Sequence, residues 1–245
     1  MNIDAKGIHY KVLNEKIHEL VDSGEKDIVL DSINGQRYVG DGLRGPDVKI
    51  TINGVPGNDL AAFMDGPTII VNANGQDGVA NTMNSGKVII KGNAGDILGH
   101  SMRGGKIFVQ GNVGYRVGIH MKAYKELYPV IIIGGTAQDF FGEYMSGGLM
   151  VVLGLNKAPD QPIVGNYVGT GMHAGVMYIR GKVEDYQLGK EIKKFEMDEE
   201  DKTRLKVYLE EYHKYFDIDI ESIVKDEFVK LIPYTHRPYG KLYTY

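Results

Sequence analysis

The stretch KVIIKGNAGDILGHSMRGG, residues 87–105, decides the fold because its pattern recurs along much of the chain. Its order is a short β-favouring strand, a glycine, a Gly-Asp corner, an apolar pair, a second glycine and a methionine. The next segment, residues 106–122, repeats this order. A repeat of about twenty residues indicates a solenoid of stacked units, because one such unit cannot bury both faces of its strands alone.

Composition limits the class of protein. The chain has 245 residues, of which 42% are hydrophobic, so it can bury a sizeable core. A net charge of −4 gives no basic surface for nucleic acid, so no nucleic-acid partner is expected. The absence of cysteine excludes disulfides, a thiol nucleophile and cysteine-ligated metal centres. No signal peptide or membrane-length apolar run is seen, which predicts a cytoplasmic protein without a membrane partner.

Two columns of residues define the repeat, which covers residues 28–183. The first residue of each expected strand is Ile28, Val48, Thr68, Val88, Ile107, Val130, Met150 and Met177. The column near the end of each unit reads Leu43, Met64, Met83, Met102, Met121, Met145 and Met172. The repeat positions that we expect to be structural are Gly92, Gly95, Gly99, Met102, Gly111, Gly114, Gly118, Met121, Gly134, Met145, Gly154, Met172 and Gly181.

The repeat predicts a mainly β fold, a single-stranded right-handed parallel β-helix of about seven or eight coils. Stacking in register would point one face of each strand into a shared core. We expect the glycines where the backbone turns sharply or needs a positive φ, and the methionines as flexible core fillers. The aliphatic positions expected to fill the core are Val88, Ile90, Ile107, Val109, Ile131, Ile133, Val151 and Leu153.

Helices are expected at both ends of the solenoid. Apolar spacing predicts one helix over residues 9–23 and others over 198–216 and 219–231. Because a β-helix ends in unpaired strand edges, these helices should cap the ends or pack on the side. The expected domains are a helical cap at 1–27, the β-helix at 28–183 and a helical extension at 184–245. A tyrosine-rich tail, residues 232–245, closes the chain, and insertions at 123–128 and 155–164 are expected on the surface.

Two of the seven histidines, His100 and His120, precede the methionine column in neighbouring units and could stack on each other. A metal site would need a third ligand at an equivalent position. The residues two before the methionine are instead Asn81, His100, Ile119, Glu143 and Thr170, which form no consistent ligand set. We expect no metal ligand, and leave open whether these histidines contact a partner.

Asp96, Asp139 and Glu143 could form a carboxylate pair of the kind found in β-helix enzymes that act on polysaccharides. Asp and Asn are also the usual corner residues beside glycine, because they hydrogen-bond nearby backbone. Asp77 and Asp96 occupy that corner in neighbouring units, which favours the structural interpretation.

Two glycine-rich segments resemble functional loops superficially. GTGMHAG at 169–175 lacks the lysine of a phosphate loop and falls on the repeat, as does the segment at 134–148. No serine lies in a Gly-x-Ser-x-Gly elbow. We therefore expect no catalytic, cofactor-binding or metal-binding residue in this chain.

The repeat, the NAGD corner at 93–96 and EYMSGGLMVVLG at 143–154 resemble the C-terminal GXGXG β-helix domain of the glutamate synthase large subunit. GNAGDILGHSMRGG is also similar to the glycine-rich repeat subunit of formylmethanofuran dehydrogenase. The segments DAKGIHYKVLNEKIHEL at 4–20 and GVPGNDLAAFMDGPTIIV at 54–71 favour glutamate synthase in its archaeal-type version, where this domain is a separate polypeptide.

The resemblance implies a non-catalytic scaffold within a complex. Glutamate synthase releases ammonia from glutamine in one part and adds it to 2-oxoglutarate at an FMN site in another, with an iron–sulfur cluster nearby. The implied partners are glutamine amidotransferase and FMN/Fe–S synthase subunits, which would carry both cofactors. Self-association as a homo-oligomer is also conceivable. Alternatives are a scaffold in a formylmethanofuran dehydrogenase-type complex, or an independent β-helix enzyme acting on carbohydrate or acyl substrates.

Overall fold

Short runs of β-branched and aliphatic residues form strands here because glycine, Asn or Asp corners bound them. The computed structural model describes residues 1–234. The strands are β1 (Asn2–Asp4), β2 (Asp27–Asn34), β3 (Lys49–Val55), β4 (Asp65–Val71), β5 (Ser85–Ile90), β6 (Lys106–Val109), β7 (Val130–Ile133), β8 (Ser146–Val152), β9 (Ala174–Arg180), β10 (Ile192–Glu196) and β11 (Phe228–Pro233). The helices are α1 (Tyr10–Asp22), α2 (Glu199–His213) and α3 (Ile220–Ile223), with a 3-10 turn at Asp185–Gln187.

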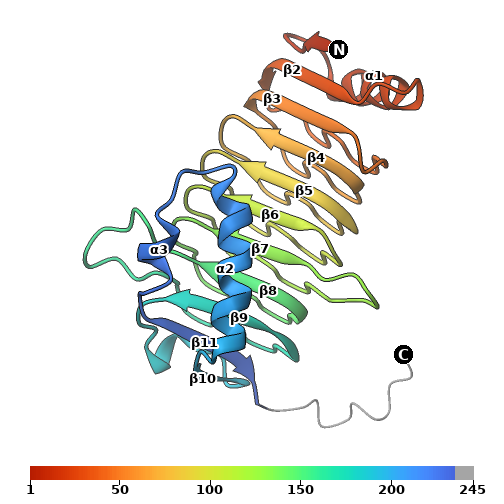
Figure 1. Cartoon of the computed structure of the whole chain (residues 1–245). Helices are drawn as coiled ribbons and strands as arrows, with labels where there is room; N and C mark the ends of the chain where they lie inside the picture. Colours follow the sequence, from red (N-terminus) through yellow and green to blue (C-terminus); the bar gives the residue numbers. More distant parts are fainter. Residues whose placement is uncertain (235–245) are drawn as a thin grey trace.

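The strands form one sheet in the order β1 to β9, then β11 and β10, and β1 to β9 are all parallel (Figure 1). The chain returns through corners between strands, which makes it a parallel β-solenoid and confirms the predicted fold class. About six turns separate Leu43 from Met172, slightly fewer than the seven or eight coils expected. The chain before β2 and after β9 does not complete a further coil, which accounts for the difference.

One inward-facing column runs through the sheet at Ile28, Ile50, Ile69, Val88, Ile107, Ile131, Met150 and Met177. The expected strand starts at Val48, Thr68 and Val130 are therefore wrong. Thr68 and Val130 lie one residue before the true position, and a slip of one residue turns a side chain to the opposite face of a strand. Val48 precedes β3 altogether.

The sheet is buried on both faces between β5 and β9. Its inner face forms the solenoid core, and its outer face packs under α2 through residues such as Phe108 and Leu209 (Figure 1). Val151 and Leu153, expected in the inner core, belong instead to this outer cluster. Both faces of β8 are buried, so its apolar residues run continuously and do not reveal which side chains point inward.

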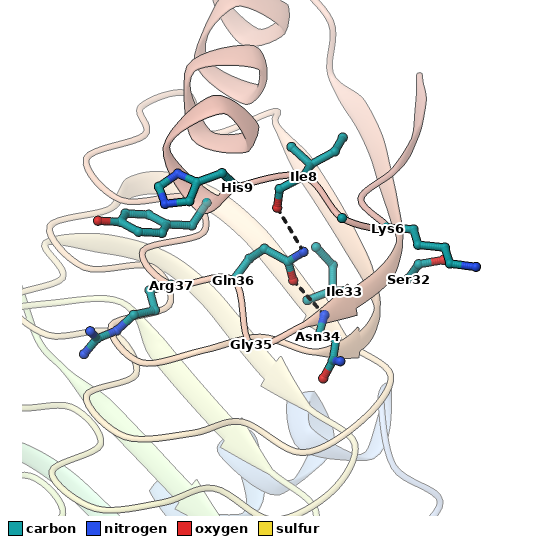
Figure 2. Close-up of a pocket in the computed structure, with 11 residues that line it drawn as sticks. Lys6, Ile8, His9, Ser32, Ile33, Asn34, Gly35, Gln36 and Arg37 are labelled. Carbon is teal, nitrogen blue, oxygen red and sulfur yellow. Dashed lines mark hydrogen bonds between the residues drawn. The ribbon is translucent and has the colours of Figure 1, made fainter.

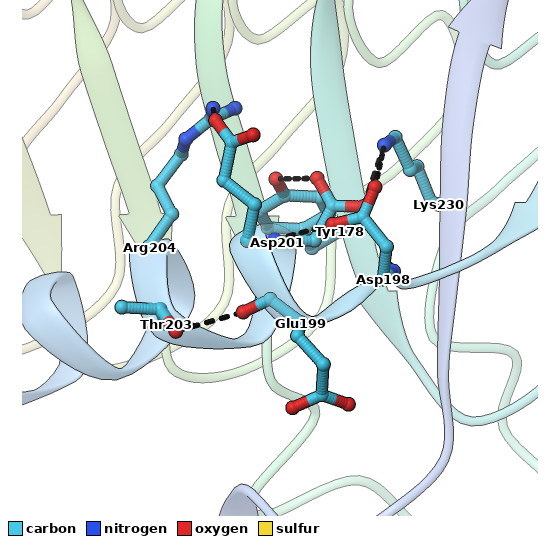
Figure 3. Close-up of polar contacts among 8 residues, drawn as sticks. Tyr178, Asp198, Glu199, Asp201, Thr203, Arg204 and Lys230 are labelled. Carbon is cyan, nitrogen blue, oxygen red and sulfur yellow. Dashed lines mark hydrogen bonds and ion pairs between the residues drawn. The ribbon is translucent and has the colours of Figure 1, made fainter.

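Polar contacts anchor α2 to the sheet at both ends. Near its start, Asp201 accepts hydrogen bonds from Tyr178 Oη at 2.6 Å and Lys230 Nζ at 2.5 Å (Figure 3). Near its end, Glu211 forms ion pairs with Lys87, at 2.7 Å, and with Lys106. The predicted helix at 198–216 thus lies along the side of the solenoid rather than across its end (Figure 1).

The C-terminal part differs from expectation. Residues 219–231, predicted as one helix, contain only the four residues of α3, and Phe228–Pro233 form β11. β11 pairs antiparallel with β9 and with β10, so a hairpin ends the sheet. Residues 235–245 of the tyrosine-rich tail lie outside the described part of the chain. At the other end, α1 occupies most of the helix predicted at 9–23 and packs Leu13 and Ile17 on the first coil.

Both insertions lie at the surface. In the first, Tyr124 and Leu127 pair with each other, and Tyr124 is exposed. In the second, residues 156–160 are all exposed. Among residues 1–234, no helix combines the length and apolar composition needed to cross a membrane.

Candidate functional site

Seven equivalent segments form one side of the solenoid, which we call the third side; the sheet and the glycine corners after the strands form the other two. The segments are residues 37–43, 58–64, 77–83, 96–102, 115–121, 139–145 and 166–172. Backbone hydrogen bonds join neighbours, as from Ala80 N to Leu60 O at 2.7 Å and from Gly99 N to Val79 O at 2.8 Å. The third side carries every candidate side chain of the sequence: His100, His120, Asp96, Asp139 and Glu143.

The backbone of each segment is left-handed at three alternating positions. In residues 96–102 these are Ile97 (φ 51°), Gly99 (71°) and Ser101 (54°). The middle position faces the core, where a Cβ on Gly99 would lie 2.5 Å from Ile131 Cδ1. A side chain there would be both strained and crowded, so glycine is favoured for two reasons. The outer positions instead project their side chains away from the core.

A ladder of Asp and Asn side chains runs along one edge of the third side. Asp77 Oδ1 accepts the Asp96 N–H at 2.8 Å, Asp96 Oδ1 accepts the Tyr115 N–H at 2.8 Å, and Asp139 Oδ1 accepts the Asn166 N–H at 2.7 Å. Each carboxylate thus holds the next coil in register. The geometry agrees with the structural interpretation of Asp96 and Asp139, and gives no acid–base pair between them.

The same ladder explains glycines that the sequence assigned to turns. A Cβ on Gly114 would lie 2.0 Å from Asp96 Oδ1, and one on Gly95 would lie 2.0 Å from Asp77 Oδ1. Five of the expected repeat glycines do not have a positive φ, namely Gly92, Gly95, Gly111, Gly114 and Gly134. For these, the expected reason was wrong: glycine is needed because an oxygen of the preceding coil occupies the space of a Cβ.

Of the remaining repeat positions, Gly118 plays the same core-facing role as Gly99, with a Cβ that would meet Met150 at 2.5 Å. Gly154 and Gly181 follow β8 and β9 with φ of 57° and 84°. The methionine positions are fully buried in the core: Met102, Met121, Met145 and Met172.

The two histidines are brought together, as expected. The ring centroids of His100 and His120 are 6.0 Å apart in an edge-to-face arrangement, and His120 stacks on Tyr144 at 5.2 Å. His100 Nδ1 lies 3.1 Å from Asn81 Oδ1. Burial and then the nearby His120 lower the pKa of His100, with Asp59 opposing. The rings therefore form a stacked ladder that favours neutral His100.

Glu143 is engaged in an ion pair rather than poised as an acid. Its buried carboxylate binds Arg116, whose guanidinium also lies 4.4 Å from the centre of the Phe140 ring. Phe140 in turn stacks on Tyr167 at 4.8 Å. Within residues 1–234, no group of three or more His, Asp or Glu side chains is placed to hold a metal ion. The outward-facing groups of the third side thus hold coils together and form a surface for contacts.

A separate pocket lies where the N-terminal cap meets the first coil, lined by residues 6–10 and 32–37 (Figure 2). It encloses about 810 Å³. Gln36 Nε2 donates to Ala5 O at 3.0 Å, and the Asn34 N–H donates to Gln36 Oε1 at 2.7 Å. These bonds fasten the cap to the coil. Sequence reasoning missed the pocket because its two segments are distant along the chain and carry no shared motif.

Comparison with known proteins places this architecture. The sequence profile of the GXGXG motif matches residues 27–235. The chain belongs to the GXGXG motif family. An uncharacterized protein of Methanocaldococcus jannaschii is 50% identical over 249 positions, which cover 99% of this chain and 95% of that protein. The predicted resemblance to the GXGXG domain of glutamate synthase is thereby confirmed at the level of the family.

The GXGXG pattern corresponds to the three alternating left-handed positions of the third side. Gly169 and Gly171, with φ of 67° and 69°, occupy the second and third of them in the last segment. This accounts for GTGMHAG at 169–175 without a phosphate, because Gly171 lies directly against the Tyr144 ring. The segment 58–64 fills all three positions without glycine, at Asp59, Ala61 and Phe63.

Proposed function

We propose that this chain is a structural subunit of a glutamate synthase-type complex and holds its catalytic subunits in place. Those partners are a glutamine amidotransferase subunit and a synthase subunit that adds ammonia to 2-oxoglutarate. Membership of the GXGXG family supports this role. The observation that carries it is the use of the side chains: Asp96, Asp139 and Glu143 bind groups of neighbouring coils and are not left for chemistry.

The cofactors of such a complex, FMN and an iron–sulfur cluster, would reside on the partner subunits. The chain has no cysteine, so it offers no thiolate to a cluster. The contribution of the solenoid would be geometric. Its coils are fixed to one another by backbone ladders and by side-chain caps, so surfaces at its two ends keep a fixed separation.

The test is reconstitution with the amidotransferase and synthase subunits encoded in the same genome. We expect the tagged chain to co-purify with both, and glutamine-dependent glutamate formation from 2-oxoglutarate to require it. Ammonia-dependent synthesis by the synthase subunit should depend on it much less, because free ammonia needs no channelling between subunits. Turnover of glycans or acyl donors by the purified chain alone would contradict the proposal.

The same pull-down separates the alternative complex. Recovery of a molybdenum or tungsten protein, without an amidotransferase, would replace the proposal with a formylmethanofuran dehydrogenase-type scaffold. Recovery of the chain with no partner at all would refute both.

A further inference from the structure

The third side has the composition of a buried interface. The chain contains 21 lysines, and none lies in the seven segments that form this side. Lysine is the residue that most often keeps a free surface solvated, and it is depleted in protein–protein interfaces. The sheet side, in contrast, carries Lys87 and Lys106 and is already covered by α2.

Exposed aromatic side chains replace the lysines. Phe63 is 58% exposed and Tyr167 54%, and Tyr115 and Tyr144 are nearly half exposed. Tyr144 and Tyr167 are fixed by stacking on His120 and Phe140. Rigid aromatic groups lose little conformational entropy on binding, and they are enriched at the energetic centres of interfaces. Phe63 also keeps a left-handed backbone, φ 57°, that favours glycine, although its side chain gains little burial.

The two edges of the third side differ in charge. The edge that begins each segment carries Asp77, Asp96 and Asp139. The residue that follows each segment forms the other edge, where Arg44 and Arg103 are exposed. Asp96 and Arg103 thus lie at opposite edges of the same coil.

We propose that the third side binds the third side of a second copy of this chain, about a two-fold axis parallel to the solenoid. This axis brings the first edge of one copy against the last edge of the other at the same coil, so that Asp96 faces Arg103 twice. A two-fold axis across the solenoid would place acidic edge on acidic edge. Arg37 and Arg44 of the first coil oppose each other in the proposed dimer, at its solvent-exposed end where salt screens them.

The dimensions of the third side suit a stable dimer. Seven coils at a strand spacing of about 4.8 Å are about 34 Å long, and seven residues of partly extended chain are about 20 Å wide. The two copies would together cover about 1,400 Å², within the range of standard interfaces, about 1,200–2,000 Å². Such a dimer forms from the chain alone and does not depend on its role in a larger complex.

Sedimentation of the purified chain over a range of concentrations tests the dimer. We expect the wild type to be dimeric at micromolar concentration and Phe63→Gly to be monomeric, with at least a tenfold weaker association. Gly relieves the left-handed strain of Phe63, so the thermal midpoint of the monomer should not fall. The matched control is Phe195→Thr, which removes an exposed phenylalanine of β10, far from the third side, and should leave the dimer intact.

A charge test fixes the orientation. Arg103→Glu places like charges opposite each other and should weaken the dimer about tenfold. Adding Asp96→Asn should restore part of the affinity, because Asn keeps the Oδ1 acceptor for the Tyr115 N–H but removes the repulsion. A monomeric wild type would overturn the proposal and leave the third side to a partner protein. A dimer that survives Phe63→Gly, or one that Asp96→Asn fails to rescue, would overturn it as well.

Discussion

At the scale of single residues, the fold depends on short contacts between coils that only glycine permits. Gly114 has an ordinary φ, yet Asp96 Oδ1 would lie 2.0 Å from any Cβ there, while the same oxygen accepts the Tyr115 N–H. The carboxylate cannot move without giving up that hydrogen bond. The glycine and the acid of the preceding coil therefore form one unit.

We expect Gly114→Ala to lower the free energy of unfolding by about 2–3 kcal/mol, since it overpacks this contact and displaces the cap of the next coil. Gly181→Ala is the matched control. Its φ is 84° but nothing lies within 4 Å of a new Cβ, so it should cost only about 1–2 kcal/mol. Urea unfolding of both variants measures the difference. An equal loss would mean that the contact with Asp96 carries no weight.

At the scale of elements, α2 is held by carboxylates that are ionised in the folded chain. Burial opposes ionisation of Asp201, but hydrogen bonds from Lys230, Tyr178 and the Asp198 N–H together lower its pKa. Burial likewise opposes ionisation of Glu211, and its bonds to Lys106 and Lys87 together lower its pKa. Lowered folded-state values mean that this stabilisation is present above the ordinary pKa, about 4, and is lost as the pH falls below it.

Acid should therefore release α2 before it unfolds the solenoid. Between about pH 5 and 3, we expect amide hydrogen exchange of residues 199–213 to accelerate more than that of β3 and β4, which no helix covers. Asp201→Asn should weaken protection of the helix already at pH 7 and flatten its pH dependence. The control is Glu199→Gln, because the Glu199–Lys202 pair is at the surface. Uniform acceleration across the chain would contradict the prediction.

The elements also show what a sequence can predict here. The methionine column and the glycine corners follow from a repeat period, which pins one residue per coil. The register of β3, β4 and β7 could not be read from that period, because corners vary in length by a residue or two. The strand β11 was predicted as helix because Ile220, Ile223 and Val224 fit a helical spacing up to the end of α3. Its pairing with β9 is a long-range contact that local spacing does not encode.

The candidate site was predictable as residue types but not as a surface. Sequence columns placed His100 beside His120 correctly, because stacking follows from the repeat. The pairing of Glu143 with Arg116 joins neighbouring coils at different positions of the repeat, so no single column contains both. The exposure of Phe63 and Tyr167 on one side required the alternating backbone to be known.

At the scale of the whole molecule, each coil contacts only its neighbours, apart from α2. Stability should then be a sum of coil and neighbour terms rather than a property of one core. A defect in the middle should spread to adjacent coils and fade with distance.

We expect Gly114→Ala to raise hydrogen-exchange rates in β6 and β7, which flank the altered contact, by at least tenfold. The rates in β2 should change by less than twofold, because several intact interfaces lie between. Exchange measured by mass spectrometry on peptides from each strand gives the profile. An equal rise in β2 would show that the solenoid opens as a single cooperative block.

The antiparallel hairpin of β10 and β11 has a consequence for how the chain behaves at high concentration. A stack of parallel strands that ended at β9 would present a template on which the first coil of another molecule could continue, and filaments could grow end to end. The hairpin reverses the chain direction and presents an outer edge with Lys193, Lys194 and Glu196. The length of the particle is thereby set within a single polypeptide, as a ruler is cut to size.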